Sequence, residues 1–121
     1  MKRDMDLIRQ LLLRLNEKDT TAHVDDIEVN GFTKFEVGYN LLLMYDAGLL
    51  IAEPQKTNTG RTISILPFDL TWEGHELLDK IRNDSIWEEI KHGYKEKGLK
   101  SISIDLLKRM SDKFIREKLG L

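Results

Sequence analysis

The chain has 121 residues, of which 40% are hydrophobic and 33% are charged, and its formal net charge is −2. These values are ordinary for one globular domain, and the absence of cysteine excludes disulfides, thiolate catalysis and cysteine-based zinc sites. Because the sequence has no apolar run long enough to span a bilayer and no signal-peptide core, we expect a cytoplasmic protein without membrane contact.

A first helix is expected from Asp4 to about Lys18. Its apolar face repeats at helical spacing and consists of Met5, Ile8, Leu11, Leu12 and Leu15. Arg9 and Arg14 are expected to face water. The following segment, residues 23–30, fits either a short helix or a short strand, where an ordinary helix-turn-helix has a full helix. We expect an abbreviated helix there.

Residues 31–49, GFTKFEVGYNLLLMYDAGL, have the pattern of a capped amphipathic helix. Thr33 and Glu36 have the spacing of a capping box, in which each side chain accepts a hydrogen bond from the other residue's backbone N–H. The apolar stripe recurs every three or four residues and consists of Val37, Leu41 and Met44, with Leu42 and Tyr45 beside them. Gly48 supplies the left-handed conformation that ends a helix.

A β-hairpin is expected to follow this helix directly. Residues 49–51 form a short β-type run, residues 54–60 are polar and rich in turn formers, and residues 61–66 alternate as a returning strand. A helix followed by such a hairpin indicates an α+β winged helix, with a helix-turn-helix core and a wing of two or three strands.

Three further helices are expected after the wing. Thr71 caps a helix from Trp72 to about Arg82, which breaks at Asn83 and Asp84. Ser85 and Glu88 then have capping-box spacing, and Ser101 or Ser103 precedes a last helix over residues 104–119, with a stripe of Leu107, Met110, Phe114 and Ile115. We therefore expect a single domain over residues 1–121, with core and wing in residues 1–83. Residues 84–121 form a helical extension that thickens the core or makes a homodimer contact.

Several segments together resemble an uncharacterised domain-of-unknown-function family of Gram-positive bacteria and their phages and prophages. The resemblance covers nearly the whole chain, and it rests on MKRDMDLIRQLLL, GYNLLLMYDAGLL, LTWEGHELLDKIR and the tail. It implies a small protein of phage or prophage origin with a winged-helix core. The family has no established activity and no catalytic residues to carry over to this chain.

Double-stranded DNA is one partner that this architecture suggests. On the central helix Lys34, Tyr39 and Asn40 are expected on the exposed face, and asparagine can form a bidentate pair with adenine. On the wing Lys56, Asn58 and Arg61 can contact phosphates or the minor groove. Each of these residues also has a plainer interpretation, as half-buried packing, a solvated surface residue or part of an ordinary polar hairpin.

The charge distribution is also compatible with a protein partner. Residues 17–53 carry eight acidic and two basic residues, a net charge of −6, whereas residues 99–121 carry +3, including Lys100. An acidic surface around Asp25 and Asp26 suits a basic protein partner. Core packing is the better interpretation of both Trp72 and Trp87, and Trp87, which we expect to be the more exposed of the two, is the candidate interface anchor.

An enzymatic function has little support in the sequence. The three histidines are scattered, no carboxylate–histidine spacing resembles a metal site, and no glycine-rich phosphate loop occurs. We therefore expect a regulator without cofactor or metal that associates with DNA. The alternative is a protein-binding adaptor or host-factor modulator built on the same scaffold.

Overall fold

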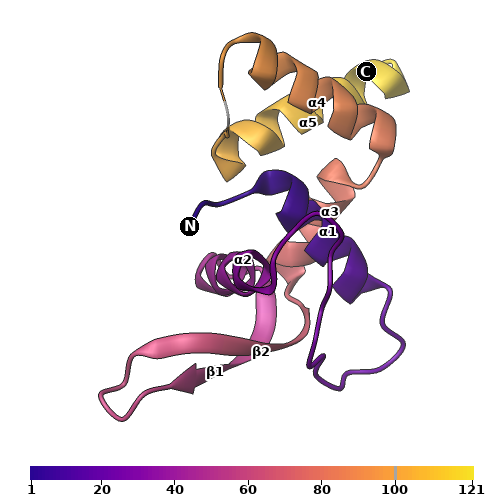
Figure 1. Ribbon diagram of the computed structural model, residues 1–121. Coiled ribbons are helices and arrows are strands. Elements are labelled where there is room, and N and C mark those ends of the chain that lie inside the picture. The colour runs from indigo at the N-terminus through magenta and orange to yellow at the C-terminus, as the bar shows by residue number, and fades with distance from the viewer. Residues whose placement is uncertain (100) are drawn as a thin grey trace. The chain divides into compact units, whose positions relative to one another are not determined.

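The computed structural model describes residues 1–99 and 101–121; Lys100, which contributes to the expected positive charge of the tail, lies outside the described residues. Within these ranges the chain is α+β, with five helices and one two-stranded antiparallel sheet (Figure 1). It forms two compact units, Met1–His75 and Glu76–Leu121. The boundary between the two units falls inside helix α3, Trp72–Ile81.

Helix α1, Met5–Asn16, supplies much of the core of the first unit. The Asp4 side chain caps it by accepting a hydrogen bond from the backbone N–H of Leu7 at 3.1 Å, and all five predicted apolar residues are buried. Arg14 is exposed as expected. Arg9 is only 6% exposed, so the prediction that it faces water is wrong.

The segment between α1 and the next helix contains no helix, which corrects the abbreviated helix expected over residues 23–30. Asp25, Asp26, Asn30 and Gly31 are all poor helix formers. The backbone bonds elsewhere instead, because the N–H of Val24 donates to the carbonyl of Pro67 at 3.0 Å. A helix-turn-helix normally has a helix at this place. Here residues 17–33, which we call the strap, have an irregular backbone instead.

Helix α2, Lys34–Asp46, confirms the predicted capping box. The N–H of Glu36 donates to the Thr33 hydroxyl at 3.1 Å, and the N–H of Thr33 donates to the Glu36 carboxylate at 2.9 Å. The predicted apolar stripe is buried. Gly48, just beyond the helix, has a φ of 77°, which only glycine adopts at little cost.

Strands β1, Leu50–Lys56, and β2, Thr62–Leu70, form the expected hairpin, which Figure 1 shows projecting beyond α2. Both strands are longer than the sequence suggests, and Pro54 lies inside β1 instead of opening the turn. In a two-stranded ribbon every strand is an edge, so a proline without an N–H is tolerated there. The register between the two strands shifts after Ile51 and after Gln55.

The second unit contains the end of α3, helix α4, Asp84–Glu96, and helix α5, Ile104–Leu119. Ser103 caps α5 as predicted, accepting from the N–H of Leu106 at 3.2 Å. Asn83 caps α4, which corrects the capping box proposed for Ser85 and Glu88. Of the stripe predicted for α5, Leu107 is fully buried and the other three residues are half-buried.

Candidate functional site

The tip of the β1–β2 hairpin is a short, internally bonded turn. The N–H of Thr57 donates to the carbonyl of Arg61 at 2.8 Å, and the N–H of Gly60 donates to the carbonyl of Thr57 at 3.0 Å. The Thr57 hydroxyl also accepts from the N–H of Arg61 at 3.2 Å. These bonds hold the backbone while Lys56, Asn58 and Arg61 stay exposed. The three predicted wing residues are therefore brought together on one turn.

The hairpin tip has a local positive charge although the whole chain is slightly acidic. Residues 54–68 contain Lys56 and Arg61 and no carboxylate. The acidic residues of the hairpin, Glu53 and Asp69, lie just outside that range, toward the base. A cationic tip on a polar turn can contact phosphate groups. Because the basic residues lie at the tip and the acidic residues toward the base, phosphate is attracted to the tip of the hairpin and repelled from its base.

The exposed face of α2 offers less than expected. Lys34 is exposed and Tyr39 is half-buried, but Asn40 is only 1% exposed. Its carbonyl oxygen accepts from the N–H of Asp4 at 2.9 Å, and its amide nitrogen donates to the carbonyls of Glu36 at 2.9 Å and Lys2 at 3.3 Å. The prediction that Asn40 reads base edges is wrong, because its side chain fastens the N-terminal arm to α2.

The acidic residues Asp25 and Asp26 are exposed on the strap, and Asp25 lies 3.0 Å from the ring nitrogen of His23. The His23 ring meets the ring of Phe68 edge-on, with centroids 5.8 Å apart. The two predicted carboxylates are therefore accessible, on a strap that is attached to β2 through Val24 and His23.

The two tryptophans have the reverse of their predicted exposures. Trp87 is 2% exposed and Trp72 is 77% exposed, so the interface anchor proposed at Trp87 is wrong. Helical phase explains the difference. Trp72 lies nine positions before the buried Ile81, and nine helical residues turn the chain by about 180°, so Trp72 lies on the opposite face of α3. Trp87 lies seven positions before the buried Tyr94, about two full turns, so both residues lie on the same face of α4. This phase was readable from the sequence.

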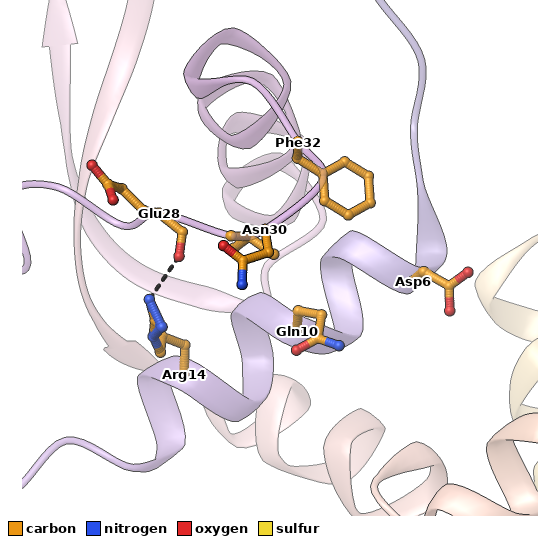
Figure 2. A pocket seen from close by; sticks show the side chains of 7 residues that line it. Asp6, Gln10, Arg14, Glu28, Asn30 and Phe32 are labelled. Atoms are coloured by element: carbon orange, nitrogen blue, oxygen red, sulfur yellow. Dashed lines mark hydrogen bonds between the residues drawn. The ribbon is translucent and has the colours of Figure 1, made fainter.

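A hollow of about 740 Å³ lies between α1 and residues 28–32, and no pattern in the sequence predicted it. Figure 2 shows its lining side chains, which are Asp6, Gln10, Arg14, Glu28, Val29, Asn30 and Phe32. The guanidinium of Arg14 donates to the backbone carbonyl of Glu28 at 2.7 Å and so ties the strap to α1. The lining set contains neither histidine nor a hydroxyl group, so it offers no pair of a serine-type nucleophile with a histidine base.

Neither a metal site nor a membrane-crossing helix occurs among the described residues. No group of three or more histidine, aspartate or glutamate side chains in residues 1–99 and 101–121 is placed to hold a metal ion. Among the helices of the same residues, none combines the length and the apolar character that crossing a bilayer requires.

The chain belongs to a family of uncharacterised proteins: the family model described as "Hypothetical protein (DUF2513)" matches residues 2–100. An uncharacterised protein of Haemophilus influenzae is 38% identical over 123 residues, which cover 99% of this chain and 100% of that relative. No solved protein structure matches the chain. The expected resemblance to an uncharacterised family is confirmed, and the expected Gram-positive and phage association stays a prediction.

Proposed function

We propose that this protein is a small cytoplasmic regulator of phage or prophage type that associates with double-stranded DNA through its β1–β2 hairpin. It acts without enzymatic activity, cofactor or metal. In this proposal α1, α2 and the hairpin form a reduced winged helix that lacks a helix between α1 and α2, and the wing, rather than the helix before it, makes the principal contact.

The observation that carries this proposal is the hairpin tip. Lys56 and Arg61 are exposed on a turn whose backbone is held by its own hydrogen bonds, within a stretch of fifteen residues, 54–68, that lacks a carboxylate. Contacts between basic side chains and phosphates release counterions and supply most of the affinity of non-specific DNA binding. The turn loses little conformational entropy on binding because it is already ordered.

Helix α2 has a secondary role in this proposal. With Asn40 buried, its exposed face retains Lys34 and the half-buried Tyr39, next to the carboxylate of Glu36. The exposed Asp25 and Asp26 add negative charge to the strap that precedes it. Phosphate is repelled by these carboxylates, so we expect weak sequence discrimination and a contact that is dominated by the wing.

Fluorescence anisotropy with a labelled random-sequence duplex, first at low salt and then at increasing salt, tests the proposal. We expect saturable, salt-sensitive binding. The slope of log affinity against log salt is negative, and each lost phosphate contact reduces its magnitude by about 0.9. The double variant Lys56→Ala/Arg61→Ala should therefore make the slope less negative by about 1.8. The charge-matched control Lys95→Ala/Lys97→Ala removes two exposed lysines of the second unit and should leave the slope unchanged. Absence of binding by the wild type at low salt, or an equal loss in the control, would refute DNA association through the hairpin.

A protein-binding adaptor or host-factor modulator is the second candidate function. It is favoured by the strap, where residues 19–33 contain four carboxylates and no lysine or arginine, and where Asp25 and Asp26 are exposed. A surface of this kind attracts a basic partner protein. Charge reversal at Asp25 and Asp26 should weaken such a contact and leave the hairpin's salt-dependent DNA binding in place.

A further inference from the structure

Trp72 is the most exposed aromatic side chain among the described residues, with 77% of its surface accessible, and no requirement of the fold explains it. Large apolar side chains at this level of exposure are frequent in binding surfaces, where tryptophan contributes more energy than almost any other residue. Ile51, on β1, is 54% exposed and lies near the same end of the hairpin. Two large apolar side chains therefore face solvent in this part of the first unit.

The hydrogen bonds around Thr71 place Trp72 at a junction of three elements. The N–H of Thr71 donates to the carbonyl of Leu49 at 3.0 Å, and its hydroxyl donates to the carbonyl of Gly48 at 2.5 Å. The end of α2, the start of β1 and the first turn of α3 therefore meet at the base of the hairpin. We call the exposed and half-buried side chains of this corner the hairpin base; they are Asp46, Ile51, Glu53, Asp69, Trp72 and Glu73.

The hairpin base is rich in carboxylates, although the ammonium group of Lys18 donates to the carbonyl of Phe68, the residue before Asp69. Residues 42–55 and 62–75 contain four carboxylates, those of Asp46, Glu53, Asp69 and Glu73, and no lysine or arginine. Asp46 lies in the last turn of α2, where the helix macrodipole disfavours negative charge and no basic residue compensates it. Local helix stability therefore does not account for the carboxylate at Asp46.

We propose that the hairpin base binds a lysine- or arginine-rich segment of another protein, with Trp72 as its aromatic anchor. The face of the indole ring attracts a cationic side chain, Ile51 packs against its aliphatic stem, and the carboxylates supply the charge complement. The same carboxylates repel nucleic-acid phosphates and an identical surface of a second copy. This partner class belongs to the adaptor function, so the proposal rests on that second candidate function.

The test uses the full chain and a fluorescein-labelled oligolysine peptide as probe, with oligoglutamate as the charge control. Anisotropy should show binding of oligolysine that weakens with salt, and Trp72→Ala should weaken it about tenfold or more, the effect of losing an interface anchor. Phe35→Ala, which removes another exposed aromatic ring (69% exposed) on the first turn of α2, is the matched control and should have no effect. Asp46→Asn/Glu53→Gln should weaken binding and reduce its salt dependence.

Tryptophan emission gives a second readout that is specific to position 72. Binding of the probe should shift the emission of the wild type to shorter wavelength, and this shift should disappear in Trp72→Phe, which retains only the buried Trp87. Trp87 is the remaining tryptophan of this variant and is buried, so unchanged emission of Trp87 in the absence of the probe shows that the variant is folded.

The alternative outcomes separate the surface from the function. One outcome is that oligolysine binds, that Trp72→Ala has no effect on binding, and that Asp25→Asn/Asp26→Asn abolishes it. In that case the hairpin base is not the binding surface, while the adaptor function stands. If the wild type does not bind oligolysine at low salt, both fail. If sedimentation shows self-association that Trp72→Ala abolishes, the occupant is a second copy and the proposal of a separate basic partner is wrong.

Discussion

Replacing Gly74 by alanine tests how closely the first turn of α3 approaches the hairpin base. A Cβ atom at position 74 would lie closer than 3.0 Å to the carbonyl oxygen of Leu49, and 3.2 Å from both its carbonyl carbon and the Cβ of Leu70. The Leu49 oxygen is backbone and already accepts the N–H of Thr71 at 3.0 Å, so it cannot move without weakening that bond. The substitution should therefore displace α3 from the hairpin.

The expected magnitude follows from three terms. Forcing an extra methyl group into a packed site costs about 1–3 kcal/mol, and weakening the Thr71–Leu49 hydrogen bond costs about 1 kcal/mol. The higher helix propensity of alanine returns about 1 kcal/mol. The net destabilisation is about 1–3 kcal/mol, and at roughly 4 °C per kcal/mol for a chain of this size the Tm should fall by roughly 4–12 °C.

Thermal unfolding followed by circular dichroism measures the change, and two other helical glycines serve as controls. Gly38, in α2, has nothing within 4 Å of the position that a methyl group would take, so Gly38→Ala should stabilise by about 1 kcal/mol. At Gly93 the nearest atom is the flexible Met110 Cε at 3.1 Å, so Gly93→Ala should be close to neutral. A Gly74→Ala protein as stable as Gly38→Ala would refute the close approach.

Three further substitutions have expected outcomes in urea unfolding. Asn40→Ala should destabilise by about 2–3 kcal/mol, because it removes hydrogen bonds to the arm and leaves the N–H of Asp4 without its partner; an unchanged midpoint would mean that the side chain is solvated. Asp46→Asn should stabilise by about 0.3–1 kcal/mol by removing a charge that opposes the α2 macrodipole, an effect that high salt should diminish. Ser111→Ala should destabilise by about 1 kcal/mol, since the buried Ser111 hydroxyl donates to the carbonyl of Lys80; Ser101→Ala, at an exposed position, is its control.

Local sequence signals predicted most of the elements. The capping box of Thr33 and Glu36, the glycine at position 48 and the cap at Ser103 act within a few residues, so their geometry depends little on the rest of the fold. The exposures of the tryptophans also follow from helical phase, which the expectations for Trp72 and Trp87 did not take into account. The hairpin itself was predicted, but its turn is shorter than the predicted loop 54–60, because residues 54–56 pair as part of β1 and the bonded turn covers residues 57–61.

Other features depend on partners that are distant in the sequence. Asn40 is buried because residues 2 and 4 lie against it, at a separation of 36 residues in the case of Asp4. The strap is irregular because the N–H of Val24 bonds to Pro67 and the side chain of Arg14 to Glu28. These contacts join residues that are far apart in the sequence, so the periodicity of a single segment does not predict them.

The sequence by itself determined helices α1 to α5, the caps at Thr33 and Ser103 and the charge of the hairpin tip, because these follow from interactions between residues in the same turn or strand. The tertiary structure alone decided which polar side chains remain available for a partner. It buried Asn40 against the N-terminal arm and joined three elements at the hairpin base through Thr71. Burial depends on what packs against a residue, and that is a property of the folded chain rather than of any one segment.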